Sequence, residues 1–225
     1  MESLFEKISK ILRENGVDSP RMEARMIFGN VLELDYTQVS GRENYSSAQE
    51  KKMFDFVQQR ISGKPLDKIL GIKFFYKNEF LVDENVLSPR PDTEILVEQA
   101  IEIAQKIEAK NILDMGTGSG CILLSILEEC KNMCGIGIDI SSKALEIARK
   151  NRENMGLTES AILLQKSWYD ADFSDIFSAY FMASPSKFTV QNGACNDKIN
   201  FGLYSFITST INFVSISLFG WFPEK

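Results

Sequence analysis

A glycine-rich turn lies between two apolar segments at residues 111–127, NILDMGTGSGCILLSIL. Glycine inside regular structure costs about 0.5–1 kcal/mol relative to alanine, so three glycines at alternate positions require a reason. The segment before the turn has the pattern of a buried strand, and the segment after it has that of a helix. This combination predicts that a ligand approaches the bare backbone of the turn.

Strand-like and helix-like segments alternate from this turn onward. NILDM precedes CILLSILEEC, CGIGID precedes SSKALEIARKNREN, and AILLQ is a third strand-like segment. Alternation of this kind favours right-handed crossovers and an α/β fold, with a parallel sheet covered by helices on both faces. Before the turn, residues 92–109 have the apolar spacing of a helix.

The residues before this region have a different pattern. Ser19 followed by Pro20 predicts a helix start, and Ser47 with Glu50 fits a capping box, so residues 1–72 are predicted to form a small helical domain. Residues 73–91 are predicted to be a β-hairpin linker, with its turn near Lys77 and Asn78. A ligand-binding α/β domain is predicted over 92–175, and residues 176–225 form an atypical tail.

Composition excludes several classes of function. The net charge of −6 argues against direct binding of nucleic acid. The absence of histidine excludes Ser-His-Asp and Cys-His catalysis and histidine metal sites. The four cysteines have no CxxC spacing and no secretory signal opens the chain, so we expect reduced thiols, a cytoplasmic protein and no metal site.

The glycine turn and an acidic residue after the second strand together indicate a nucleoside site. Gly116, Gly118 and Gly120 form a GxGxG pattern. The dinucleotide fingerprint has a further glycine at its sixth position, where this chain has Cys121, and this difference points away from NAD. Asp139 ends the second strand about 20 residues on, where a carboxylate can accept hydrogen bonds from ribose hydroxyls. The alternatives are a tight turn without a ligand and a helix cap at Asp139, although Ser141 is the better cap.

The segments LSPRPDTEILVE, ILDMGTGSGCILLSIL, GIDISSKALEIARKN and LLQKSWYDADF together resemble the release factor glutamine methyltransferases, the PrmC/HemK family. The resemblance covers residues 1 to about 175. It implies a class I S-adenosylmethionine-dependent methyltransferase fold, Rossmann-like with a doubly wound sheet. It also implies methylation of a glutamine side-chain amide nitrogen in peptide chain release factors. We expect a monomer whose helical N-terminal domain binds the protein substrate, with no membrane partner.

The resemblance also implies roles for individual residues. The turn would line the methionine end of S-adenosylmethionine, Asp139 would bind its ribose, and Trp168 would flank the adenine, unless Trp168 is ordinary core packing. Ser167 departs from the family, where an acidic residue is usual. Arg90 and Glu94 of the RPDTE segment either brace the cofactor loop or form a surface pair. The expected cofactor-binding residues are therefore Gly116, Thr117, Gly118, Ser119, Gly120, Asp139 and Trp168.

The tail departs from the family. The Asn-Pro-Pro-Tyr segment that holds the glutamine amide in the family is absent, so no catalytic residue can be identified. Residues 176–225 contain five charged side chains, and residues 199–222 contain none. Their Ser, Thr and Asn content argues against a membrane helix. The hypothesis is a reading frame disrupted near Ile176, which would leave the sheet incomplete and the activity impaired. The alternatives are a non-catalytic module that binds S-adenosylmethionine or the release factor, and a nucleic-acid amino-methyltransferase.

Overall fold

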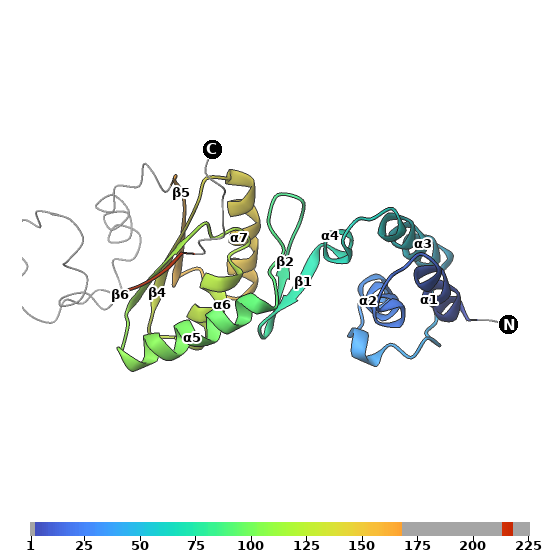
Figure 1. Ribbon diagram of the computed structural model, residues 1–225, viewed down its shortest axis with the longest axis horizontal. Helices are drawn as coiled ribbons and strands as arrows, with labels where there is room; N and C mark the ends of the chain where they lie inside the picture. The colour runs from blue at the N-terminus through green and yellow to red at the C-terminus, as the bar shows by residue number, and fades with distance from the viewer. Residues whose placement is uncertain (1–2, 168–212, 218–225) are drawn as a thin grey trace, which may run out of the picture. The chain divides into compact units, whose positions relative to one another are not determined.

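The computed structural model describes residues 3–167 and 213–217. The chain divides into two compact units, Met1–Ile72 and Lys73–Lys225, which are described separately. Figure 1 labels the helices and strands.

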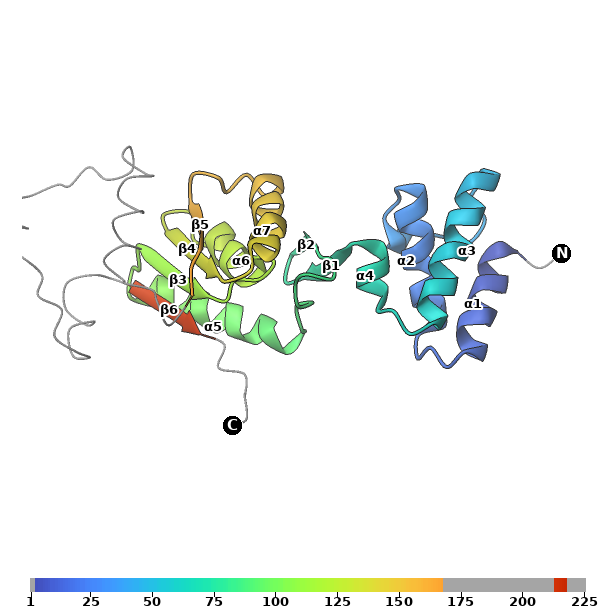
Figure 2. The same cartoon turned by 90° about the horizontal axis from the view of Figure 1, so that it is seen from above.

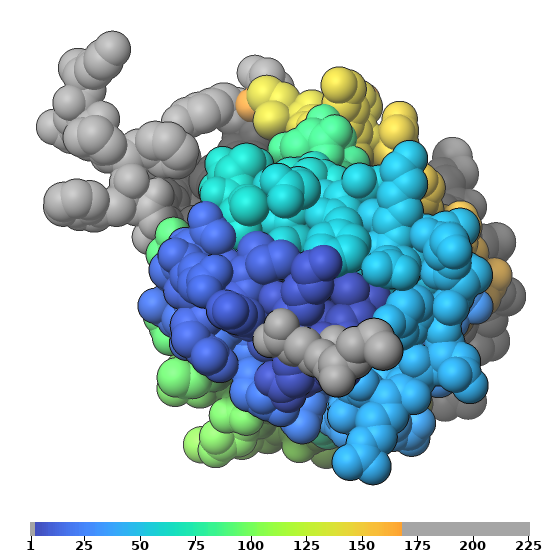
Figure 3. Space-filling view, turned by 90° about the vertical axis from the view of Figure 1, so that its right-hand side faces the viewer, coloured from blue at the N-terminus to red at the C-terminus, as the bar shows by residue number. Residues whose placement is uncertain are grey.

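The first unit is helical, and Figure 3 shows its surface in blue to cyan. Its core is a cluster of buried apolar side chains that includes Ile8, Phe28 and Met53. Phe5 and Phe28 pack edge to face with ring centroids 5.5 Å apart. The elements are α1 (Leu4–Glu14), α2 (Pro20–Leu32), the 3-10 helix η1 (Tyr36–Gln38), α3 (Ser47–Ile61) and α4 (Leu66–Leu70).

The N-termini of α2 and α3 can be compared with the capping residues predicted from the sequence. Helix α2 begins at Pro20 with Ser19 as its N-cap, as predicted, although the Ser19 side chain makes no capping hydrogen bond. The capping box of α3 is one residue earlier than predicted. Ser46 Oγ accepts a hydrogen bond from the Gln49 N–H at 3.2 Å, and Gln49 Oε1 accepts one from the Ser46 N–H at 2.8 Å. The prediction with Ser47 and Glu50 was wrong because two overlapping S-x-x-[EQ] patterns occur here, and the structure uses the first.

A β-hairpin follows the first unit along the chain. Strands β1 (Ile72–Phe75) and β2 (Asn78–Leu81) flank a turn at Tyr76 and Lys77, close to the predicted turn. Tyr76 has a φ of 57°, in the left-handed region that tight turns require. Phe75 and Phe80 are both buried and pack edge to face with centroids 6.1 Å apart.

The second unit contains a four-stranded sheet in the order β5-β4-β3-β6. All three pairings are parallel, with Asn111 opposite both Cys134 of β4 and Phe213 of β6. Figure 2 shows the strands in this order. The elements are α5 (Asp92–Lys106), β3 (Asn111–Met115), α6 (Cys121–Glu129), β4 (Cys134–Asp139), α7 (Ser142–Asn154), β5 (Ala161–Gln165) and β6 (Phe213–Ser217).

Side chains of the sheet alternate between two apolar clusters. Ile112 and Leu163 belong to a cluster with buried residues of α5, α6 and α7, whereas Leu113 and Ile136 belong to a second cluster. Neighbouring residues of a strand point to opposite faces, so the three helices share one face, as Figure 1 shows. Successive right-handed crossovers from β3 to β4 to β5 run in one direction, which places α6 and α7 on the same side. Within the described residues, no helical layer covers the other face.

The three strands predicted from the sequence have the expected bounds. Strand β6, inside the atypical tail, was not predicted, and it adds a parallel strand beside β3. Among the described helices, none has both the length and the apolar character needed to cross a bilayer.

Candidate functional site

The candidate site lies at the carboxyl end of β3, in residues 116–120, which we call the glycine loop. The chain order runs from β3 through β4 to β5 in one direction and then returns to the other side of β3 with β6. In open parallel sheets, ligands bind beyond the carboxyl ends of the strands where the order reverses. The topology therefore places the glycine loop at the expected binding position.

The glycines of the loop are required for two different reasons. Gly116, Gly118 and Gly120 all have positive φ, at 82°, 55° and 81°. A Cβ on Gly118 would meet only the Gly116 carbonyl oxygen at 3.9 Å, so the space over this residue is open to a ligand. A Cβ on Gly120 would lie 3.0 Å from Leu124 Cδ1 and 3.4 Å from Ala148 Cβ, so Gly120 allows α6 and α7 to pack closely.

The other two residues of the glycine loop turn their side chains into the protein. Thr117 is 5% exposed and Ser119 is 2% exposed. Thr117 Oγ1 donates a hydrogen bond of 2.8 Å to Asp114 Oδ2. A ligand over the loop would therefore meet the backbone of Thr117 and Ser119 and not their side chains. The glycine pattern of the sequence alone could not distinguish these two kinds of contact.

Asp139 lies beside the glycine loop, at the end of β4. Its Oδ2 accepts a hydrogen bond from the Gly118 N–H at 2.9 Å, and its Oδ1 accepts one from the Ser141 N–H at 2.9 Å. Ser141 is the N-cap of α7, as predicted, because its Oγ accepts from the Ala144 N–H at 3.2 Å. An ionised carboxylate has about four acceptor sites, so Asp139 can accept further hydrogen bonds from a ligand.

Ile140, between Asp139 and Ser141, is 70% exposed. It directly follows Asp139 in the chain and therefore adjoins the candidate site. The sequence held one signal for it, an isoleucine directly after the strand-ending acid and directly before a helix cap.

Asp114 lies beneath the glycine loop and was not singled out from the sequence. It is 3% exposed, and its Oδ2 accepts a hydrogen bond from the Thr117 hydroxyl. Burial raises the pKa of Asp114 from 3.8 to about 6, the Thr117 hydrogen bond lowers it, and the charge of Asp139 raises it. Asp114 thus holds the loop from below and brings a second acidic group to this end of the sheet.

The cysteines near the site do not form a reactive centre. Burial raises the pKa of Cys121 to about 12, which leaves it a thiol at neutral pH. Cys121, Cys130 and Cys134 are all buried, without a disulfide. No metal-binding group of three His, Cys, Asp or Glu side chains occurs among the residues that the structure describes.

Trp168, Arg90 and Glu94 are the remaining predicted residues. Trp168 falls outside the described residues, so its predicted contact with adenine stays a prediction. Arg90 is exposed and Glu94 is partly exposed. The described residues show no ion pair between Arg90 and Glu94, and both proposed roles stay predictions.

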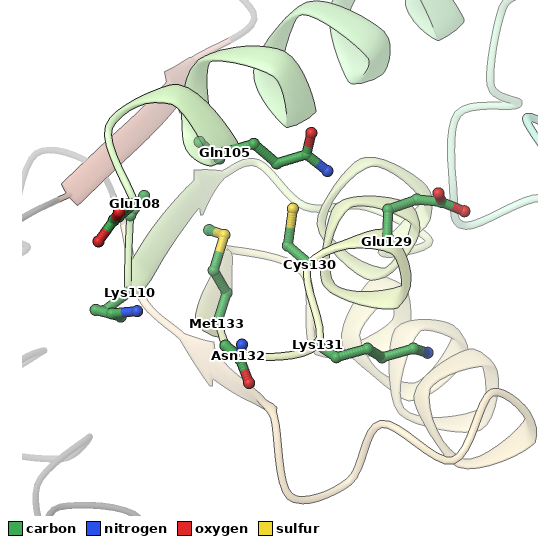
Figure 4. Close-up of a pocket in the computed structure, with 10 residues that line it drawn as sticks. Gln105, Glu108, Lys110, Glu129, Cys130, Lys131, Asn132 and Met133 are labelled. Carbon is green, nitrogen blue, oxygen red and sulfur yellow. The ribbon is translucent and has the colours of Figure 1, made fainter.

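A hollow of about 460 Å³ lies at the opposite end of the sheet, before β3 and β4 begin (Figure 4). Lys110, Glu129, Lys131 and Met133 are among its lining residues. Because ligands of parallel sheets bind at the carboxyl ends of the strands, we place the site at the glycine loop and not in this hollow.

Comparison with known families agrees with these two units. Residues 3–71 match the family described as the PrmC N-terminal domain, and residues 106–196 match a methyltransferase domain. The second match includes the glycine loop and Asp139. It confirms the methyltransferase fold that the sequence predicts, and the first confirms the helical domain before it.

Curated relatives match most of this chain. The release factor glutamine methyltransferase of Caulobacter vibrioides is 35% identical over 168 residues, 74% of this chain and 58% of its own. That of Fusobacterium nucleatum is 38% identical over 169 residues, 70% of this chain and 47% of its own. The bifunctional methyltransferase of Rickettsia typhi is 30% identical over 73% of this chain and 35% of its own. The chain thus spans about half the length of the curated relatives it matches.

Solved structures are similar over smaller parts. An RNA methyltransferase from Salinibacter ruber, determined in complex with S-adenosyl-L-homocysteine, is 28% identical, with a TM-score of 0.34, and the match covers 40% of this chain and 55% of that chain. The predicted resemblance to the release factor glutamine methyltransferase family is confirmed over about three quarters of the chain, which joins a PrmC N-terminal domain to a methyltransferase domain.

Proposed function

We propose that the glycine loop and Asp139 bind S-adenosyl-L-methionine, and that the chain methylates a glutamine side-chain amide nitrogen in peptide chain release factors. The observation that carries this proposal is the open backbone at Gly118 beside the Asp139 carboxylate, in a chain that matches a methyltransferase domain. The substrate comes from the names of the relatives, whose matches cover 70–74% of this chain.

The charges of the site fit a cationic cofactor better than a dinucleotide. A pyrophosphate would need the free N–H groups at the amino end of α6. The buried Asp114 carboxyl group lies beneath the glycine loop, just before α6, and it would repel a phosphate when ionised. A sulfonium with an amino-acid ammonium group is instead attracted by the two acidic groups.

The contacts of Asp139 fit a ribose. Its two oxygens each accept one backbone hydrogen bond, and their remaining acceptor sites suit the paired hydroxyls of a sugar. Ile140 would then pack against the adenine ring, and Trp168 is proposed for the same ring on the family pattern. Gly116, Thr117, Gly118, Ser119 and Gly120 would present backbone to the methionine end.

When bound, S-adenosyl-L-methionine supplies a methyl group on a positively charged sulfur, a good leaving group. The glycine loop and Asp139 would hold the cofactor while its methyl group passed from sulfur to the glutamine nitrogen, with S-adenosyl-L-homocysteine as the leaving group and the nitrogen's proton released to water. In this reaction the described residues bind and orient, because alignment accounts for much of the barrier reduction. The sequence does not contain the Asn-Pro-Pro-Tyr segment that holds the amide hydrogens of the glutamine in the family.

The absence of that segment favours a second candidate function, a module that binds the cofactor or the release factor without turnover. It also supports our proposal that the reading frame is disrupted near Ile176. Translating the gene in the other two frames across codons 170–185 tests this. An Asn-Pro-Pro-Tyr segment in one of them is expected, and its absence from both would refute the disruption.

Two measurements on the full chain test the proposed function. Calorimetry with S-adenosyl-L-homocysteine should show saturable binding at one site. Incubation with methyl-labelled S-adenosyl-L-methionine and a release factor should transfer label to the factor, and not to a factor whose acceptor glutamine is replaced by leucine. Binding without transfer would favour the non-catalytic module, and no binding of S-adenosyl-L-homocysteine would exclude both methyl transfer and a cofactor-binding module at this site.

A further inference from the structure

A buried amide connects two segments of the second unit that are far apart in the sequence. Asn151, in the last turns of α7, is 2% exposed. Its Nδ2 donates to the Ser119 carbonyl at 2.9 Å and to the Leu81 carbonyl at 3.0 Å, while its Oδ1 accepts from the Leu81 N–H at 2.7 Å. Both amide hydrogens are therefore used, and both partners are backbone groups.

The two bonds to Leu81 fix the second strand of the hairpin. Leu81 ends β2, and one side chain satisfies both its N–H and its C=O, as a neighbouring strand would. Val82 and Val86, which follow β2, form an apolar cluster with Ala144 and Ile147 of α7. The hairpin and the segment after it are thus held to α7 by polar and apolar contacts together.

The third bond fixes the glycine loop from its buried side. Ser119 lies between Gly118 and Gly120, both of which adopt positive φ and lack side chains to restrict them. A backbone of this kind has many accessible conformations, so an anchored carbonyl restricts it strongly. Asp139 holds the Gly118 N–H, while Asn151 holds the carbonyl of the next residue, Ser119.

We propose that Asn151 is a positioning residue that couples the hairpin to the glycine loop, so that cofactor binding at the loop and the conformation of the hairpin affect each other. This inference rests on the proposed function for its ligand, an adenosyl cofactor. Coupling of this kind is reciprocal, because each site changes the other by the same free energy. The hairpin begins at Ile72, directly after the residues that match the PrmC N-terminal domain, so the coupling reaches the connection to that domain.

Hydrogen exchange on the complete wild-type chain gives the first test. Saturating S-adenosyl-L-homocysteine should slow amide exchange in residues 116–120 and also in residues 78–82, which lie outside the proposed ligand contacts. Slower exchange confined to the loop would overturn the coupling.

Substitutions at position 151 give the second test. Asn151→Ala removes all three bonds, and Asn151→Asp keeps the acceptor for the Leu81 N–H but loses both donated bonds. Each variant should weaken S-adenosyl-L-homocysteine binding about tenfold or more and should abolish the ligand-induced protection of residues 78–82. Asn154→Asp makes the same chemical change at an exposed position of α7 and should alter neither result. Wild-type affinity in Asn151→Ala, or hairpin protection that persists in it, would overturn the inference.

The failure of the inference can be told apart from the failure of the proposed function. If the wild-type chain binds no S-adenosyl-L-homocysteine, the proposed function fails. Amide hydrogen exchange without ligand then tests whether Asn151 connects the glycine loop to the hairpin. Faster exchange of residues 116–120 and 78–82 in Asn151→Ala would support this connection. Unchanged exchange of residues 116–120 would refute it.

Discussion

The Asp139 carboxylate accepts a hydrogen bond from the Gly118 backbone N–H, with 2.9 Å between Oδ2 and nitrogen. The acid expected to bind the ribose therefore also shapes the turn expected to bind the rest of the cofactor. On the proposed function, one side chain would contribute to affinity both directly and through the backbone.

Replacing Asp139 should weaken cofactor binding strongly. Asp139→Ala should lower the affinity for S-adenosyl-L-homocysteine by about 10- to 100-fold, because charge-assisted hydrogen bonds contribute about 1.5–3 kcal/mol each. Asp139→Asn retains one acceptor oxygen and should give a smaller loss. Calorimetry measures both, with Glu146→Ala on the exposed side of α7 as the control. Unchanged affinity in Asp139→Ala would remove the basis for the ribose site.

Alanine at two positions of the glycine loop should have different effects. Both Gly118→Ala and Gly120→Ala place a side chain at positive φ, which costs roughly 1–2 kcal/mol. Gly120→Ala also crowds Leu124 and Ala148 and should destabilise the fold by about 1–3 kcal/mol more. Gly118→Ala has room for its methyl group in the fold, so its larger effect should be on ligand affinity. Denaturant unfolding and calorimetry on the same variants separate the two, and equal effects on both quantities would contradict this division.

Asp114 should make the stability of the second unit depend on pH. Its pKa is raised from 3.8 to about 6 in the folded protein, so between these values the folded state holds a proton that the unfolded state has lost. The free energy of unfolding should therefore fall as the pH rises from about 4 to about 6, by at most about 3 kcal/mol, and level off above that.

The variant Asp114→Asn should flatten this pH dependence because the amide does not titrate. Urea unfolding at several pH values measures it, and Glu146→Gln should keep the wild-type slope. A slope that is the same in Asp114→Asn and in the wild type would show that another group causes it.

The two serines before α3 offer a matched test of the observed cap. Ser46→Ala removes the side-chain half of the capping box and should destabilise the first unit by about 1 kcal/mol. Ser47→Ala affects the first helical residue, where alanine is a good helix former, and should change stability by a few tenths of a kcal/mol. Hydrogen exchange of the α3 amides reports the difference, and a larger effect of Ser47→Ala would favour the box with Glu50.

Much of the second unit could be predicted because its signals are local. Strands β3, β4 and β5 are short apolar segments between polar or glycine-containing turns, and their pattern defines them without tertiary information. The choice of Ser46 over Ser47 as the N-cap of α3 could not be predicted. Both serines begin a capping-box pattern, and only the packing of the helix decides between them. Strand β6 was missed because it lies in a segment of unusual composition. That segment lacks the alternation of strand-like and helix-like patterns that identified the other strands.

The site was predictable in its backbone and less so in its side chains. The glycines and Asp139 follow a known spacing, and the structure brings Gly118 and Asp139 together. No sequence signal indicated that Thr117 and Ser119 turn inward, because burial of a short polar side chain depends on its partner, here Asp114 for Thr117. Asn151 was missed because a single asparagine in an amphipathic helix resembles an exposed one.

The contacts that shape the glycine loop join residues close in the sequence, whereas the pairing of β3 with β6 joins residues about a hundred positions apart. Asp114 reaches Thr117, Gly118 reaches Asp139 and Ser119 reaches Asn151 over 3, 21 and 32 residues. Contacts between near neighbours close with less loss of chain entropy and form sooner. On a translating ribosome, the loop should therefore reach its native shape before the codons of β6 are read.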